Sequence, residues 1–168
     1  MSRLLTMSTV GRVAAAVMVT ALSTTAVSGQ SHQAENPAAL EQQAEAYLDE
    51  MDRWGRAADL YRQAAELRDP ADPVAVSNLK TAARLEFYNG SERQALRDLQ
   101  YAGQRALAIG DVVSAANAFV DAAWVAGSDG QGQEARAMIE RAQLLVLSPL
   151  ISTEDRTEIQ RRLPVTGS

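Results

Sequence analysis

Alanines and large apolar residues recur along this chain at a spacing typical of a helix. Each copy of the pattern is a glycine, an alanine five residues later, a large apolar residue four further on and an alanine three further on. Residues three and four apart share one face of a helix, so each copy places a small, a large and a second small side chain in order along one face. Three full copies follow at steps of twenty residues: Gly90, Ala95, Leu99 and Ala102; Gly110, Ala115, Phe119 and Ala122; Gly130, Ala135, Ile139 and Ala142. The pattern predicts a stack of closely packed helices.

Glycine, proline and capping residues predict where these helices begin and end. Asn36 before Pro37 is a typical start, because the side chain can accept from a free backbone amide and the proline has none to satisfy. Gly90 and its equivalents suit a left-handed turn, and Ser91 with Gln94 predicts a capping box. We expect helices over 37–51, 54–68, 73–88, 91–109, 111–126 and 131–147, and a short seventh that starts at Ser152 and ends before Pro164.

No segment alternates between apolar and polar residues in the manner of a half-buried strand. We therefore expect an all-α fold. The short connections between the helices should make consecutive helices antiparallel neighbours.

The stretch from Leu99 to Ala122 resembles a tetratricopeptide repeat. Gly103 lies where the first helix of that family carries a small residue, and Gly110 with Asp111 occupies the turn. The resemblance implies antiparallel helical hairpins stacked as a short right-handed solenoid of about seven helices over residues 37–163. The family repeats every 34 residues or so, whereas the copies here are twenty apart, so more than one pairing is open. We take pairs one–two, three–four and five–six, with helix seven as a cap.

The first 29 residues have the three parts of a secretory signal peptide. Arg3 and Arg12 precede an apolar stretch over 13–22, and small residues follow over 23–29. Because the apolar stretch is shorter than the roughly 20 residues that span a bilayer, we expect cleavage and a periplasmic or secreted protein. An uncleaved anchor is the alternative. We expect residues 30–36 to form a flexible leader and 164–168 a disordered tail.

Composition narrows the function classes. The chain has 16 basic and 21 acidic residues, a net charge of −5, and an acidic surface disfavours nucleic acid and anionic membranes as partners. Without cysteine it has no disulfide, thiolate metal site or lipid-modified cysteine. His32, the only histidine, falls in the expected leader. We therefore expect no metal, no cofactor and no enzymatic activity, and an enzyme that uses carboxylates alone is the alternative.

The resemblance also implies a binding surface, because the first helix of each tetratricopeptide pair lines the concave face. Under our pairing, helices one, three and five supply the candidate partner-binding residues: Gln42, Lys80, Arg84, Phe87, Tyr88, Asn117 and Trp124. Lys80 and Arg84 resemble the basic pair with which some of these proteins clamp a peptide carboxylate. Trp124 as a filler between helices, and Lys80 with Arg84 as an ordinary exposed face, are the alternatives.

The expected function is a non-enzymatic scaffold for protein–protein interaction, or an accessory subunit of a periplasmic or envelope-associated complex. The expected partners are proteins, among them a membrane-anchored envelope complex, with no membrane span of this chain after signal cleavage. The alternative is a small-molecule carrier or sensor, with an apolar pocket between helices formed by Phe87, Tyr88, Phe119 and Trp124.

Overall fold

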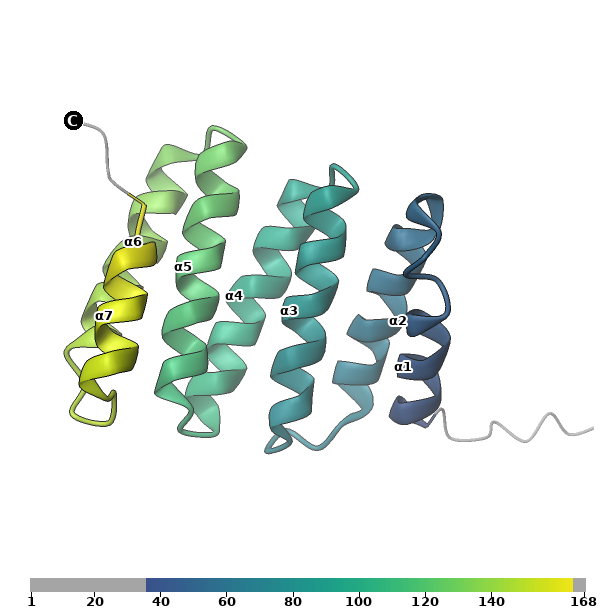
Figure 1. Ribbon diagram of the computed structural model, residues 1–168, viewed down its shortest axis with the longest axis horizontal. Coiled ribbons are helices and arrows are strands. Elements are labelled where there is room, and N and C mark those ends of the chain that lie inside the picture. Colours follow the sequence, from purple (N-terminus) through teal and green to yellow (C-terminus); the bar gives the residue numbers. More distant parts are fainter. Residues whose placement is uncertain (1–35, 165–168) are drawn as a thin grey trace, which may run out of the picture. The chain divides into compact units, whose positions relative to one another are not determined.

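The computed structural model describes residues 36–164, which form an all-helical unit (Figure 1). The expected signal peptide over 1–29, most of the leader and the tail beyond Pro164 lie outside the described residues. Within this range the structure confirms the all-α fold and the seven helices. They are α1 (Pro37–Glu45), α2 (Trp54–Leu67), α3 (Pro73–Tyr88), α4 (Glu92–Ala108), α5 (Val112–Ser128), α6 (Gly132–Val146) and α7 (Thr153–Arg162), with a 3-10 turn η1 (Met51–Arg53) before α2.

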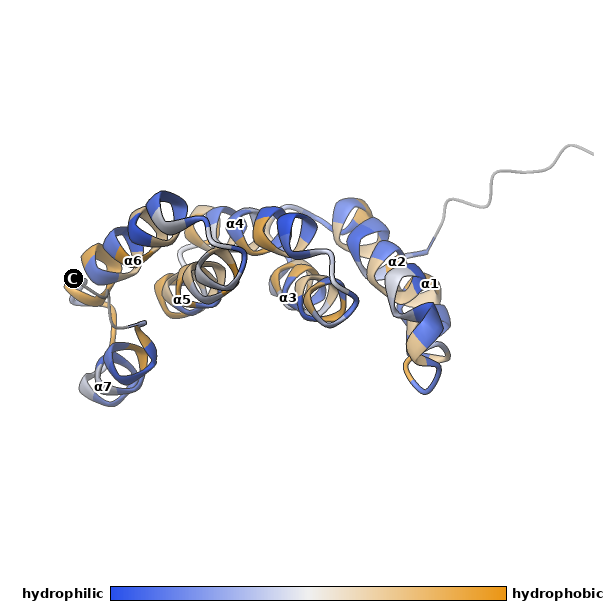
Figure 2. Cartoon of the chain, turned by 90° about the horizontal axis from the view of Figure 1, so that it is seen from above, coloured by the Kyte–Doolittle hydropathy of each residue, from blue (hydrophilic) through white to orange (hydrophobic). Residues whose placement is uncertain are grey.

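The helices of this unit lie in two layers (Figure 2). One layer holds α1, α3, α5 and α7, and the other holds α2, α4 and α6. Each helix packs mainly against its neighbours in sequence, and consecutive helices run antiparallel, as in a helical-repeat solenoid (Figure 1). The array curves so that α3 and α5 lie on the inner side, flanked by α1 and α7.

The recurring spacing marks the contacts between helices. Every alanine and every large residue in the three full copies is buried. Gly103 of α4 shows how close the helices come, because a Cβ at this position would lie 2.8 Å from the ring of Phe119 on α5. Outside the helices, Gly90, Gly110 and Gly130 have φ angles of 79°, 79° and 71°, in the left-handed region that glycine adopts most readily. The pattern therefore records both the packing and the turns.

The helix boundaries agree with the sequence except at the first connection. The expected helix over 37–51 ends at Glu45, and turns followed by η1 lead into α2. The indole nitrogen of Trp54 donates to the main-chain oxygen of Leu48 at 2.9 Å. The indole thus provides a hydrogen-bond partner for a main-chain oxygen beyond the end of α1, where the helix no longer provides one. Trp54 also packs against the small cluster of buried residues formed by α1, α2 and α3.

Side-chain caps form where the sequence predicts them, with one exception. Asn36 accepts from the backbone amide of Ala38 at 3.1 Å, and Asp111 and Ser152 cap α5 and α7 in the same way. The predicted capping box of Ser91 and Gln94 is wrong, because Ser91 makes no side-chain cap bond. Gln94 instead donates to the carboxylate of Asp98 at 2.8 Å, which is buried and needs donors.

Asp98 belongs to an ion cluster that ties three helices together. Arg62 of α2 donates to Glu86 of α3 at 2.9 Å and to Asp98 of α4 at 3.0 Å. It also pairs with Asp59 on its own helix. Burial opposes the charge of Arg62, but its hydrogen bonds to Asp98 and Glu86 outweigh that effect and raise its pKa. The guanidinium therefore stays charged and holds two successive hairpins in register.

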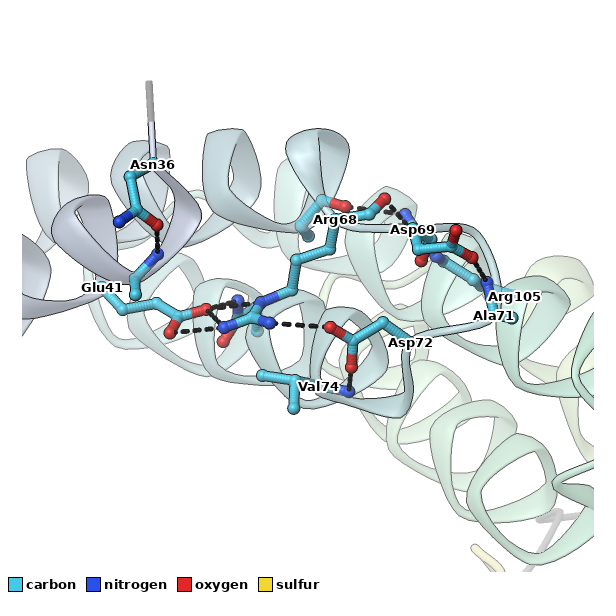
Figure 3. A network of polar contacts seen from close by, with 11 residues as sticks. Asn36, Glu41, Arg68, Asp69, Ala71, Asp72, Val74 and Arg105 are labelled. Atoms are coloured by element: carbon cyan, nitrogen blue, oxygen red, sulfur yellow. Dashed lines mark hydrogen bonds and ion pairs between the residues drawn. The ribbon is translucent and has the colours of Figure 1, made fainter. Parts of the chain in front are cut away.

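A second cluster joins the helices near the loop between α2 and α3 (Figure 3). Arg68 donates to Glu41 of α1 at 2.8 Å and to Asp72 at 2.7 Å. Arg105 of α4 donates to the main-chain oxygens of Arg68 and Asp69 at 3.0 and 2.8 Å. Arg105 also donates to the main-chain oxygen of Ala65 at 2.8 Å, in the last turn of α2, where a helix leaves oxygens without internal partners. The polar contacts in both clusters therefore join the first four helices to one another.

Candidate functional site

The helices α3 and α5 lie on the inner side of the array (Figure 2). A groove of about 640 Å³ lies between them. A single residue of α4, Leu99, contributes to its floor. The remaining lining comes from α3 and α5: Ser77, Lys80, Thr81, Ala83, Arg84, Phe87, Tyr88, Asp121, Trp124, Val125 and Ser128. The groove is thus built from one face of each helix, and it is a candidate ligand site.

The groove brings together five of the seven residues that the sequence singled out. They are Lys80, Arg84, Phe87, Tyr88 and Trp124. Gln42 lies on an exposed part of α1, outside the groove. Asn117 lies on α5 outside the lining, where its side chain donates to the main-chain oxygen of Val113 at 3.0 Å.

Lys80 and Arg84 give the groove its positive charge. They are four residues apart on α3, so their side chains leave the same face of the helix. Lys80 is half-buried and Arg84 is exposed. Within residues 36–164, neither forms an ion pair with a carboxylate. Their ammonium and guanidinium groups therefore keep their donors available to a ligand.

Aromatic rings form the apolar part of the groove. Tyr88 is 65% exposed and Trp124 is 58% exposed, so Trp124 is not a buried core residue. The rings of Phe87 and Tyr88 have centroids 5.7 Å apart. Tyr88 also lies 6.1 Å from the ring of Trp54, which extends the aromatic surface beyond the groove toward α2. Large rings held at a surface beside unpaired cations suit a ligand that is both apolar and anionic.

The last helix reaches one wall of the same groove. Arg162 at the end of α7 donates to Asn117 at 2.5 Å and to the carboxylate of Asp121. The indole nitrogen of Trp124 in turn donates to the main-chain oxygen of Arg162 at 2.8 Å. Asp121, the one acidic residue of the groove lining, is therefore paired.

Sequence reasoning missed both Asp121 and Arg162. Asp121 could have been found, since it lies four residues after Asn117 and three before Trp124 on the same face of α5. Arg162 had no comparable signal. Its role depends on the direction in which α7 returns across the end of the array, and no local pattern encodes that direction.

The expected apolar pocket is wrong in one residue. Phe119 does not line the groove. It is buried between α4 and α5 against Gly103, and the guanidinium of Arg141 lies 5.6 Å from its ring centroid. Phe119, the large residue of its copy of the repeated spacing, therefore serves packing, and the aromatic residues of the groove lie outside that spacing.

Two further observations describe the molecule between residues 36 and 164. In this part of the chain no three or more acidic, histidine or cysteine side chains gather in a way that could hold a metal ion. None of the helices in the same range has the length and apolar character needed to cross a bilayer.

Comparison of the chain with known protein families and with curated proteins gives no match. The functional proposal therefore rests on the fold and the groove.

Proposed function

We propose that this protein is a non-enzymatic binding protein that holds a protein partner through the groove between α3 and α5. The observation that carries the proposal is the juxtaposition of Lys80 and Arg84, free of carboxylate partners among the described residues, with the exposed rings of Tyr88 and Trp124. Apolar side chains of a partner segment would cover the rings, and a carboxylate on that segment would pair with the cations. The groove runs between two helices, which suits a short segment of a partner.

We further propose that the hairpins are tetratricopeptide-like. The two layers of antiparallel helices, the left-handed glycine turns and the close contact of Gly103 with Phe119 support this assignment. Successive inner helices begin at Pro37, Pro73 and Val112, a longer step than the 34 or so residues of the family. The twenty-residue step in the sequence separates neighbouring helices, so two such steps make one hairpin.

The partner we propose is a protein of the cell envelope, in the periplasm or outside the cell. The signal-like segment over 1–29 supports export, and the net charge of −5 disfavours nucleic acid. A scaffold or accessory subunit of an envelope complex, including a membrane-anchored one, fits a small array whose inner face carries the groove.

Affinity capture from an envelope extract, followed by mass spectrometry, tests the proposal. The variant Lys80→Glu with Arg84→Glu reverses the two charges of the groove. A matched control is Arg93→Glu with Arg97→Glu, because this pair has the same spacing and is exposed on α4 in the other layer. We expect the wild type and the control to retain one stoichiometric partner that the groove variant loses. Equal capture by all three proteins would reject the groove as the binding site.

The volume of the groove favours a second candidate, a small-molecule carrier or sensor. About 640 Å³ is within the range of roughly 300 to 1,000 Å³ that small-molecule sites occupy. Native mass spectrometry of the protein isolated from its source separates the two functions. A bound small molecule that Trp124→Ala removes, together with no captured protein, would favour the carrier.

A further inference from the structure

The charges that line the groove are not all of one sign. Lys80 and Arg84 come from α3, and Asp121 comes from α5 on the opposite wall. These three are the charged residues of the lining in the described part of the chain. A free carboxylate at this position would weaken the attraction of the groove for an anionic ligand and would compete with that ligand for the two cations.

In the structure this carboxylate is paired with Arg162 of α7. Its guanidinium binds Asp121 and Asn117, and its main-chain oxygen accepts from Trp124. The three partners lie on one face of α5, at intervals of four and three residues. One residue of α7 is therefore held at three points along a wall of the groove.

Apolar contacts dock α7 at the end of the array. Ile159 is 1% exposed, and Ile151 in the preceding connection is 4% exposed. Both belong to the main core together with residues of α5 and α6. Lys80, Arg84, Phe87 and Tyr88 have no hydrogen bond or ion pair with α7 in the described structure. The docked helix thus neutralises the acidic wall and leaves the basic and aromatic wall open.

We infer that Arg162 is a positioning residue that sequesters Asp121, so that docking of α7 favours binding of an anionic, apolar ligand in the groove. The ligand class rests on the proposed function, whereas the charge arrangement does not. Docking of α7 and binding of the ligand in the groove therefore favour each other. If α7 were instead a competitor for the groove, loosening Arg162 would strengthen binding.

Lys80 is the only lysine in the sequence, which allows a test that needs no natural partner. Reductive methylation with carbon-13 in the full-length protein labels this side chain and keeps its charge. Its NMR signal then reports what enters the groove. The probe is anilinonaphthalene sulfonate, an aromatic anion, and phenylnaphthylamine is the neutral analogue.

We expect the Lys80 signal of the wild type to titrate with the anionic probe. Arg162→Gln should weaken this binding about twofold to fivefold, the size of one solvent-exposed charge interaction. Adding Asp121→Asn to Arg162→Gln should restore it, and Arg162→Lys should largely preserve it. The matched control is Arg161→Gln, which removes the same charge from the neighbouring residue, whose partner is Glu158. Binding of the neutral analogue should be unchanged in all variants, each checked for helicity by circular dichroism.

Three results would overturn the inference. They are a wild-type Lys80 signal that does not respond to the anion, an Arg162→Gln variant that binds it equally or more tightly, and equal weakening of both probes, which would mean that Arg162 only holds the helix. The inference and the proposed function can fail separately. The probe series can behave as expected while no protein partner is captured, and a partner can bind through Lys80 while Arg162→Gln has no effect.

Discussion

Gly103 of α4 lies directly against the ring of Phe119 of α5, so close that a Cβ at position 103 would come within 2.8 Å of two carbon atoms of the ring and 3.1 Å of a third. Both ring and glycine are buried, and the neighbouring helices leave the ring little room to shift. The contact sets the approach of the second hairpin to the third. The wall of the groove that α5 provides is positioned through this contact.

Gly103→Ala should therefore destabilise the protein. An alanine inside a helix normally gains up to about 1 kcal/mol over glycine, but the clash with Phe119 should cost about 1 to 3 kcal/mol and decide the sign. The measurement is urea unfolding followed by circular dichroism. Gly127→Ala is the matched control, because Gly127 is helical and a Cβ there meets nothing within 4 Å. A Gly103→Ala variant as stable as that control would contradict the close packing of α4 and α5.

Removal of Arg62 should cost much more stability than removal of an exposed arginine. Arg62→Ala leaves the buried carboxylates of Glu86 and Asp98 without their cation, which should cost about 3 kcal/mol of unfolding free energy. Arg161→Ala breaks only the exposed pair with Glu158 and should change the unfolding free energy by less than about 1 kcal/mol. Thermal and urea unfolding of both variants give the comparison. Equal losses of unfolding free energy in the two variants would mean that the ion pairs of Arg62 do not stabilise the packing of the hairpins.

Acid should destabilise the array partly through Asp72. The backbone amide of Val74 and then the guanidinium of Arg68 lower the pKa of this carboxyl. A carboxyl with a lower pKa in the folded state contributes stability above its unfolded pKa of about 3.9, and the contribution is lost as the pH falls through the folded value. Asp72→Asn keeps an N-cap for α3 and loses the pair with Arg68. We expect its unfolding free energy to fall less than that of the wild type between about pH 5 and pH 2, and parallel curves would refute this.

Much of the fold could be predicted from the sequence because its determinants are local. The bounds of α3 agree with the expectation at both ends, since Pro73 and the Asn89–Gly90 pair act on the chain within one turn. The buried alanines could be found for the same reason, as their spacing is that of one helix face. The two errors have a different origin. Gln94 donates to Asp98 four residues further along α4, a carboxylate that Arg62 of α2 also binds, and Trp54 donates to the main-chain oxygen of Leu48 in the connection after α1. In both places a side-chain bond that the spacing alone does not indicate takes the place of the expected one.

The groove could be predicted in part for a related reason. Lys80, Arg84, Phe87 and Tyr88 share one helix, so their common face follows from spacing alone. The pairing of Asp121 with Arg162 links residues 41 apart in the sequence. Only the folded position of α7 brings them together, and it determines which charges of the groove are free.

The most direct test of the central claim is the affinity of the captured partner for three purified proteins. The dissociation constant is measured by calorimetry for the wild type, for Lys80→Glu with Arg84→Glu, and for the control Arg93→Glu with Arg97→Glu. Reversal of two unpaired groove charges should weaken binding at least about tenfold at an unchanged melting temperature, and the control should bind as the wild type does. Equal affinity of all three proteins would contradict the assignment of the groove between α3 and α5 as the partner-binding site.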